Sequence, residues 1–327
     1  MTRRDIMAAT IFIDGEAGTT GLQIRKRLEG RDDIRLMSLG DAERKDVERR
    51  RARLNEADIV VLCLPDDAAR EAVAMIENDA VRVIDASSAH RTADGWIYGF
   101  PEYAPGQRAA IAAAKRVTNP GCYAITSVAM LHPLVEAGLI ATDWPVTINA
   151  ISGYSGGGKG LIRAFEDDSA PDHTDAPFRL YALGLDHKHV PEIQHRSGLV
   201  HRPLFVPSVG HYRQGMLVSL PLQLDALPGK PGADDIHRAL TERYEGERHV
   251  RVLPRAETAA LSKLEPEALN GTNDLHLHVF ANEGAGQALV VGLIDNLGKG
   301  ASGQALQNLN LMLGAPEETG LDTPLVL

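Results

Sequence analysis

Short apolar blocks alternate with polar, amphipathic blocks over residues 1–120. Apolar runs of this length predict buried strands, and the amphipathic or charged stretches between them predict helices. The predicted strands cover 9–14, 34–39, 58–64 and 81–85, and the predicted helices cover 22–28, 41–56 and 68–77. Strands that alternate with helices in this way predict βαβ units with right-handed crossovers. The first part of the chain is therefore predicted to be α/β, a Rossmann-type doubly wound parallel sheet.

The pattern changes from about residue 145 onward. Apolar residues at every second position of 216–224 are typical of a half-buried antiparallel strand. Two further strands flank the turn residues 282–286, which predicts a hairpin. The other elements expected here are a strand at 146–151 and helices at 234–244 and 302–313. This half is predicted to be an α+β domain with a mostly antiparallel sheet.

Length and composition support two domains of an ordinary globular protein. The chain has 327 residues, more than one hydrophobic core usually supports. A net charge of −10 argues against nucleic-acid and anionic-membrane partners. No apolar run approaches the roughly 20 residues of a membrane span. The first residues lead into a strand and not into a signal sequence, so we expect a cytoplasmic protein. No metal-binding spacing is present, and we expect no metal site.

The two cysteines lie in different settings. Cys63 is inside an apolar run, which predicts a small residue of the core. Cys122 follows Pro-Gly and opens a helical pattern that runs to Gly138. Unpaired N–H groups and the positive end of the dipole at a helix N-terminus favour thiolate, the form that attacks carbonyl carbon. Cys122 is thus a candidate nucleophile, with a structural cysteine in a turn as the alternative.

The sequence Gly15-x-x-Gly18-x-x-Gly21 connects the first strand to the first helix. Glycines allow the backbone to turn sharply and to approach a pyrophosphate, which then lies at the helix N-terminus. This context predicts a dinucleotide site that includes the intervening Thr19 and Thr20.

The end of the second strand bears on which dinucleotide binds. NAD-specific folds place an acidic residue there to bind the ribose 2′-hydroxyl. This chain instead has Ser38 there, followed closely by Arg44 and Lys45. These residues fit a 2′-phosphate and predict NADP(H). The alternative is that Arg44 and Lys45 are solvated helix charges.

The chain has twelve histidines, and one group of them has neighbours suited to catalysis. His187 and His189 lie with a lysine and two carboxylates just before a helix that begins near Pro191. A cysteine-based acyl-transfer enzyme needs a histidine to accept and donate protons, and Glu192 could orient an imidazole. The alternative is a charged loop. His276 and His278 alternate with strand leucines, which predicts that both face solvent or an interface.

Several longer motifs occur in order along nearly the whole chain. They are 85–91 (Asp-Ala-Ser-Ser-Ala-His-Arg), 98–102 (Tyr-Gly-Phe-Pro-Glu), 119–123 (Asn-Pro-Gly-Cys-Tyr), 152–159, 187–193 and 295–310. With the glycine turn, they resemble the N-acetyl-γ-glutamyl-phosphate reductase family in its shorter branch, which is related to aspartate-semialdehyde dehydrogenase. The resemblance implies a small acyl-phosphate substrate, NADPH as the cofactor, a homo-oligomer (dimer or tetramer) and a role in arginine biosynthesis.

The resemblance also implies a mechanism and a set of site residues. Cys122 attacks the γ-acyl phosphate and phosphate leaves; hydride then reduces the thioester to the semialdehyde, and His189 is the acid/base. The implied cofactor residues are Gly15, Gly18, Thr19, Thr20, Gly21, Ser38, Arg44, Ser87, Gly156, Asn296 and Lys299. The implied substrate residues are Arg91, Asn119, Ser155, Lys159 and Arg213, among which the basic side chains suit phosphate and carboxylate.

The resemblance implies that the last helix returns to the dinucleotide domain. The predicted domains are then 1–122 with 302–327 for the dinucleotide, and 123–301 for catalysis and dimerisation. Two alternatives remain open. One is another acyl-phosphate reductase, such as aspartate-semialdehyde dehydrogenase or a lysine-pathway homologue. The other is a nucleotide-sensing binding protein without chemistry, which would be expected to have lost Cys122 or His189.

Overall fold

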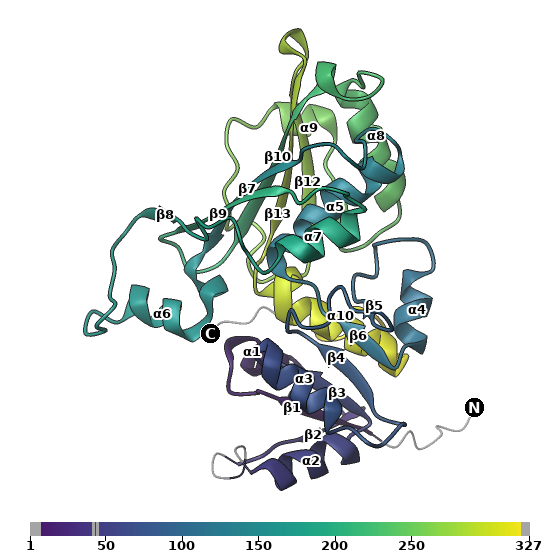
Figure 1. Cartoon of the computed structure of the whole chain (residues 1–327), viewed down its shortest axis with the longest axis vertical. Coiled ribbons are helices and arrows are strands. Elements are labelled where there is room, and N and C mark those ends of the chain that lie inside the picture. The colour runs from purple at the N-terminus through teal and green to yellow at the C-terminus, as the bar shows by residue number, and fades with distance from the viewer. Residues whose placement is uncertain (1–7, 41–42, 44–45, 322–327) are drawn as a thin grey trace. The chain divides into compact units, whose positions relative to one another are not determined.

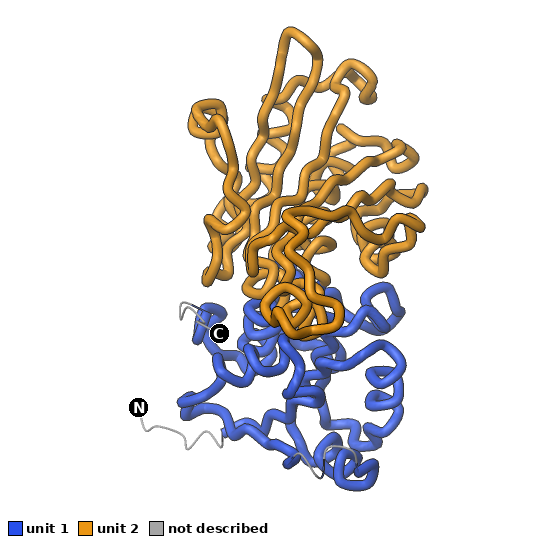
Figure 2. Tube along the Cα trace, turned by 90° about the vertical axis from the view of Figure 1, so that its left-hand side faces the viewer, with its two compact units in different colours: residues 1–101, 106–120, 302–327 blue, residues 102–105, 121–301 orange. Residues whose placement is uncertain are grey.

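A computed structural model describes residues 8–40, 43 and 46–321. The chain divides into two compact units, coloured separately in Figure 2. Unit 1 comprises 1–101, 106–120 and 302–327, and unit 2 comprises 102–105 and 121–301. In the described residues, no helix is both long and apolar enough to cross a membrane.

Unit 1 is built on a parallel sheet with strand order β2-β1-β3-β4-β6-β5 (Figure 1). The strands are β1 (Ala9–Asp14), β2 (Ile34–Met37), β3 (Ile59–Leu62), β4 (Arg82–Asp85), β5 (Ile97–Tyr98) and β6 (Arg116–Thr118). The helices are α1 (Thr19–Leu28), α2 (Val47–Glu56), α3 (Asp66–Ala74), α4 (Gln107–Ala113) and α10 (Gly303–Leu313). The predicted doubly wound parallel sheet is confirmed.

Alternate residues of the central strands enter two separate cores. Ile11 and Ile13 of β1 pack with side chains of α1, α4 and α10, whereas Phe12 packs with side chains of α2 and α3. Because successive side chains of a strand point to opposite faces, helices cover both faces of this sheet. Such strands are buried on both sides, which is why they read as continuous apolar runs in the sequence.

Helix α10 joins unit 1 through both apolar and polar contacts. Leu306 and Leu309 lie in the same core as α1. Asn308 and Gln304 each donate a side-chain hydrogen bond to the carbonyl of Gly99, at 2.9 and 2.8 Å. A Cβ on Gly99 would lie 2.3 Å from the Asn308 amide nitrogen, so only glycine allows this approach. These contacts explain why a segment distant in sequence completes this unit.

Several predicted boundaries in unit 1 shift by a few residues. Helix α1 begins at Thr19, directly after Gly18, and not at the predicted Leu22. Helix α2 begins at Val47, because the Asp46 side chain accepts hydrogen bonds from two backbone N–H groups of its first turn. The rest of the predicted 41–56 helix falls partly on residues 41–42 and 44–45, outside the described residues. The short strands β5 and β6 and helix α4 were not predicted.

Unit 2 is built on a mixed sheet of order β11-β12-β13-β10-β7-β9-β8. Most neighbours are antiparallel, as predicted, but β7/β9 and β11/β12 pair in parallel. The strands are β7 (Thr147–Gly153), β8 (Phe178–Leu180), β9 (Leu204–Gly210), β10 (Met216–Gln223), β11 (Val250–Val252), β12 (Leu275–Asn282) and β13 (Gln287–Ile294). The helices are α5 (Cys122–Glu136), α6 (Gly158–Glu166), α7 (Val190–Ser197), α8 (Ala233–Tyr244) and α9 (Arg255–Ala259).

Helix α5 packs on β10 and β13 and is almost wholly buried. It contains Pro133, which has no N–H to donate to the carbonyl of Ala129. The hydroxyl of Tyr244 on α8 donates to that carbonyl instead, at 2.9 Å. Burial raises the pKa of Tyr244 well above its usual range, so the phenol stays protonated and remains a donor. This bond compensates for the proline and ties α8 to α5.

The prediction for His278 is wrong. This side chain is buried, and its Nδ1 lies 3.4 Å from the hydroxyl of Thr258 on α9. Burial lowers the pKa of His278 to about 4, so the imidazole is neutral at pH 7. The alternation of histidine and leucine along β12 indicated one solvent-facing side, but α9 packs against β12. A sequence pattern cannot show that a separate short helix covers a polar strand face.

Candidate active site

Cys122 is the first residue of α5, which spans Cys122–Glu136, with Gly121 as its N-cap. The thiol is thus attached to the end of the helix where backbone N–H groups lack helical acceptors, a setting that favours thiolate. Gly300 packs directly against this residue, since a Cβ on Gly300 would lie 2.8 Å from the Cys122 Cβ. The predicted helix start at Cys122 is confirmed.

Cys63 follows strand β3 and packs against the apolar core of unit 1. Burial, aided by the charges of Asp85 and Asp14, raises the pKa of its thiol to about 12. Cys63 is therefore protonated at neutral pH and a poor nucleophile. This agrees with its interpretation as a core residue.

His189 is the N-cap of α7, and Pro191 lies in the first turn, as predicted for a helix that begins there. The imidazole is buried, and its centroid lies 5.8 Å from the ring of Tyr123, the residue after the candidate nucleophile. His187 lies against it, with ring centroids 4.8 Å apart. The His187 Nδ1 accepts the backbone N–H of His189 at 3.1 Å. His187 therefore helps to hold the backbone from which the His189 imidazole projects.

Tyr123 and Tyr181 form a buried polar contact beside Cys122. Tyr181 donates to the Tyr123 hydroxyl at 3.0 Å, and Tyr123 donates to the carbonyl of Ser208 at 3.3 Å. Burial raises the pKa of Tyr181 to about 12 and that of Tyr123 well above its usual range. Both phenols are therefore neutral, and their contact orients the aromatic side chain that touches His189.

Glu192 has a contact that the sequence did not predict. Its buried carboxylate accepts the backbone N–H of Gly121, at 3.1 and 3.3 Å from its two oxygens. Glu192 lies on α7, so this bond ties the helix that His189 caps to the N-cap residue of α5. The order of these residues in the chain could not show that the carboxylate reaches a backbone N–H.

The glycine turn in unit 1 packs closely against neighbouring backbone. Gly15 has φ +88°, and a Cβ there would lie 2.3 Å from the Cys63 carbonyl oxygen. A Cβ on Gly21 would lie 2.6 Å from the Gly15 carbonyl oxygen. Among the described residues, no side chain caps the first turn of α1, where Thr19 and Thr20 lie. The backbone N–H groups of this turn are thus suited to a phosphate.

Asp85, at the end of β4, organises other predicted site residues of unit 1. Its buried carboxylate accepts the backbone N–H and hydroxyl of Ser87 at 2.9 and 2.8 Å, and lies 2.6 Å from His90 Nδ1. Arg91 donates to the backbone carbonyl of Asn119 at 3.1 Å, and Asn119 donates its N–H to the Asp85 carbonyl at 2.7 Å. Ser87, Arg91 and Asn119 therefore gather where the strand ends. Neither Asp85 nor His90 was among the predicted site residues, although a carboxylate that ends a parallel strand is a recognisable signal.

A second group of predicted residues meets within unit 2. Asn296 donates to the Ser155 hydroxyl at 3.0 Å and accepts the Gly215 N–H at 2.7 Å. Gly156 is next to this pair, because a Cβ there would lie 3.5 Å from the Asn296 amide nitrogen. Lys159 is exposed near the start of α6, and the Arg213 guanidinium lies 3.0 Å from Glu166. Arg44 lies outside the described residues.

Comparison with known proteins identifies the family. Residues 23–113 match the family model described as the semialdehyde dehydrogenase NAD binding domain, and residues 122–296 match its dimerisation domain. N-acetyl-gamma-glutamyl-phosphate reductase from Burkholderia cenocepacia is 57% identical over 94% of this chain and 97% of its own. A relative from Nostoc sp., named N-acetyl-gamma-glutamyl-phosphate reductase 2, is 51% identical over 95% of this chain and 98% of its own. The chain belongs to the N-acetyl-γ-glutamyl-phosphate reductase family.

Solved structures of other enzymes share the fold of this reductase family member. Aspartate semialdehyde dehydrogenase II from Vibrio cholerae has a TM-score of 0.69, covers 94% of this chain and 99% of its own, and is 14% identical. An aspartate semialdehyde dehydrogenase from Candida albicans, solved with NADP, has a TM-score of 0.61 and is 13% identical, covering 94% of this chain and 99% of its own. At this identity the likeness shows the fold alone.

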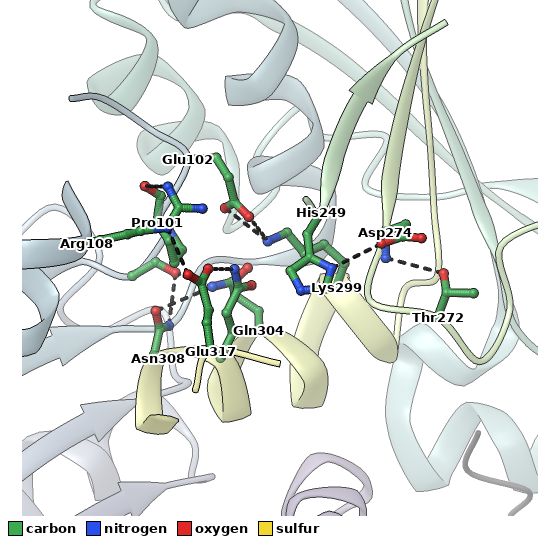
Figure 3. Close-up of polar contacts among 12 residues, drawn as sticks. Pro101, Glu102, Arg108, His249, Thr272, Asp274, Lys299, Gln304, Asn308 and Glu317 are labelled. Atoms are coloured by element: carbon green, nitrogen blue, oxygen red, sulfur yellow. Dashed lines mark hydrogen bonds and ion pairs between the residues drawn. The ribbon is translucent and has the colours of Figure 1, made fainter. Parts of the chain in front are cut away.

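Lys299, one of the predicted cofactor residues, forms a buried ion pair within unit 2. Its side chain is fully buried, and Nζ lies 2.8 and 3.0 Å from the two carboxylate oxygens of Glu102, which is also buried (Figure 3). Both residues belong to unit 2, and Lys299 directly precedes Gly300, which packs on Cys122. The ammonium is thus used to neutralise a buried carboxylate.

This ion pair predicts the effect of Lys299→Met on stability. The substitution leaves the Glu102 carboxylate buried without its cation, which costs about 3–5 kcal/mol of unfolding free energy. The double variant Lys299→Met with Glu102→Leu should recover much of that loss, as measured by urea unfolding. A Lys299→Met variant that is as stable as the wild type but binds NADPH weakly would contradict this prediction and support a direct role of Lys299 in cofactor binding.

Proposed function

We propose that this protein performs the reaction of its family: NADPH-dependent reduction of N-acetyl-L-glutamyl 5-phosphate to N-acetyl-L-glutamate 5-semialdehyde and phosphate, in arginine biosynthesis. The observation that supports it best is the placement of Cys122 as the first residue of α5, with Tyr123 and His189 in ring contact beside it. A nucleophile and a histidine on one rigid unit are what acyl transfer from an acyl phosphate needs. The names of the relatives and this arrangement of Cys122 and His189 both support the same reaction.

In the proposed mechanism, the Cys122 thiolate attacks the acyl carbon. The C–O bond to phosphate breaks, phosphate leaves with the bonding electrons, and a thioester remains on Cys122. The N–H groups of the first turn of α5 would stabilise the negative oxygen that develops during attack. His189 would accept the thiol proton first and would protonate the oxygen of the reduced thioester, giving a hemithioacetal. It would then take that proton back as the C=O bond forms, the C–S bond breaks and Cys122 leaves as a thiolate with the bonding electrons, which releases the semialdehyde.

The residues of unit 1 fit the cofactor that this chemistry needs. When bound, NADPH supplies the hydride. The glycine turn and the N-terminus of α1 would hold its pyrophosphate, and Ser87 would lie beside it at the end of β4. Gly156 and Asn296 stay as proposed cofactor residues, because their backbone and amide groups meet in one polar cluster with Ser155.

The proposed substrate residues divide by their surroundings. Lys159 is exposed and Arg213 is half-exposed, so both cations could meet the phosphate or the α-carboxylate of the substrate. Arg91 is buried and donates to backbone carbonyls, which suits positioning of Asn119. We propose that Asn119 and Ser155 bind substrate through polar side-chain atoms.

The decisive experiment is the reverse reaction. Purified protein should reduce NADP+ when given N-acetylglutamate semialdehyde and phosphate, and should do so much more slowly with aspartate semialdehyde. Equal or greater turnover of aspartate semialdehyde would favour the other acyl-phosphate reductase. Binding of NADPH without turnover of either substrate would favour a nucleotide-sensing protein.

We also propose that the chain forms a homo-oligomer, a dimer or a tetramer, in the cytoplasm. The sheet of unit 2 has an apolar groove of about 620 Å³ on the face opposite α5, lined by residues of β7, β8, β9, β10, β12 and β13. Phe178 and Leu289 line it and are 52% and 37% exposed. A second copy would cover this face, as the family model's description of a dimerisation domain suggests.

The proposed interface predicts the effect of two charged substitutions. Phe178→Glu combined with Leu289→Lys should shift the protein to a monomer, because desolvating either charge opposes association. The control is Val200→Lys, which alters a residue that is 61% exposed and does not line the groove. Molar mass from light scattering measures the outcome. If the double variant keeps the wild-type mass, this face is not the interface.

A further inference from the structure

Three side chains meet at the end of β2 in unit 1. The Arg25 guanidinium, from α1, donates to the Glu16 carboxylate at 3.0 Å and to the Ser38 hydroxyl at 3.2 Å. The Ser38 hydroxyl donates to the same Glu16 oxygen at 3.0 Å. Glu16 lies in the glycine turn. One of its carboxylate oxygens therefore accepts hydrogen bonds from a cation on α1 and from a hydroxyl at the end of β2.

This place in the fold is where dinucleotide folds distinguish their cofactors. The carboxyl end of the second strand meets the adenosine ribose, and an acidic residue there binds a 2′-hydroxyl while an arginine accommodates a 2′-phosphate. The Glu16 oxygen in this structure takes hydrogen bonds from the same two kinds of donor that a phosphate oxygen would take. Arg25 and Ser38 are therefore already arranged to bind an anion at the place where the Glu16 carboxylate lies.

The ion pair between Arg25 and Glu16 contributes little to the stability of the fold. The side chains of Arg25 and Glu16 are 39% and 25% exposed, and such partly solvated ion pairs contribute little to stability. Arg25 also lies 3.6 Å from Glu29, one turn further along α1, but Glu29 is 60% exposed. An incoming phosphate with about two negative charges can therefore displace the Glu16 carboxylate at small cost.

We propose that Arg25 is a specificity-determining residue of this enzyme: with Ser38 it binds the 2′-phosphate of NADPH, and Glu16 occupies the phosphate position in its absence. This inference rests on the proposed use of NADPH. NADH has no 2′-phosphate to displace Glu16, so Arg25 stays paired with the carboxylate. The contact then contributes to NADPH binding and not to NADH binding.

The experiment measures binding by titration calorimetry, independently of turnover. NADPH, NADH, adenosine 2′,5′-bisphosphate and adenosine 5′-phosphate are titrated into the full-length wild type and into Arg25→Gln. We expect Arg25→Gln to raise the dissociation constants of NADPH and the bisphosphate by about 10- to 100-fold. The dissociation constants of NADH and the monophosphate should change by less than about 3-fold. The matched control is Lys26→Gln, which removes the same charge from the next, exposed residue of α1.

A second variant tests the role of Glu16. Glu16→Gln removes the competing carboxylate, so the ratio of NADH to NADPH dissociation constants should increase. Glu29→Gln removes a carboxylate that lies 3.6 Å from Arg25, whereas the Ser38 hydroxyl donates to Glu16. This control should leave the ratio nearly unchanged.

The outcomes separate this inference from the function on which it rests. If wild type binds NADPH tightly and Arg25→Gln does so equally, the Arg25 assignment is overturned while the function stands. If Arg25→Gln and Lys26→Gln weaken NADPH binding equally, the effect comes from the loss of any positive charge on α1, and the assignment of Arg25 also fails. If wild type binds no NADPH, the function and the inference both fail.

Discussion

Cys122→Ser should abolish turnover, with a loss on the order of 10⁴-fold or more, and leave NADPH binding nearly intact. A serine hydroxyl is a far weaker nucleophile than a thiolate near neutral pH, and the helix N-terminus that favours thiolate cannot ionise a hydroxyl. The cofactor turn belongs to unit 1, whereas Cys122 belongs to unit 2, so the substitution leaves the turn unchanged. Turnover is measured in the reverse direction and NADPH binding by calorimetry.

The second cysteine supplies the control for this prediction. Cys63→Ala should keep most activity, since the pKa of its buried thiol is raised to about 12 and it cannot supply a thiolate at pH 7. A thiol reagent should label Cys122 in the folded protein much faster than Cys63. Equal labelling of the two, or substantial activity in Cys122→Ser, would contradict the assignment of the nucleophile.

His189→Asn should lower turnover by about 10²–10⁴-fold, the range typical of a general acid/base. His189 is buried in ring contact with Tyr123, and the backbone around it is held by α7 and by the His187 imidazole. Asparagine can preserve a hydrogen bond at this site but cannot exchange a proton. Rates measured from pH 5 to 9 should therefore lose their low-pH limb in this variant.

His187→Asn is the matched comparison, because the two imidazoles touch but have different tasks. The His187 Nδ1 accepts a backbone N–H, so its loss should loosen the position of His189 and cost far less turnover. The low-pH limb should survive in this variant. A larger loss at His187 than at His189 would transfer the acid/base role to His187.

The sequence predicted structural elements correctly where all the residues that determine the element lie in one short segment. Strand β1 was predicted with its actual bounds, because an unbroken apolar run between polar residues is a sufficient mark of a strand buried on both faces. Cys122 and the glycine turn were recognisable for a similar reason: helix starts and tight turns depend on residues next to one another. The roles of the individual site residues remain proposals.

The incorrect or missing predictions involve side chains whose partners are far away in the chain. The ion pair of Lys299 was not predicted, because its partner Glu102 is 197 positions away. His278 looked exposed because nothing in β12 itself shows that α9 packs against that strand. Arg25 was not among the predicted site residues, because only the fold brings it to Ser38.

The sequence by itself thus determined the order of strands and helices, the change from a parallel to a mostly antiparallel sheet, and the residue types able to form a thioester. These follow from periodicity and from contacts between neighbours in the chain. Only the tertiary structure decided which charges are neutralised inside a unit and which can meet a ligand. The physical reason is that burial and ion pairing depend on atoms that chain folding brings together, such as Glu102 at Lys299 and Glu192 at Gly121.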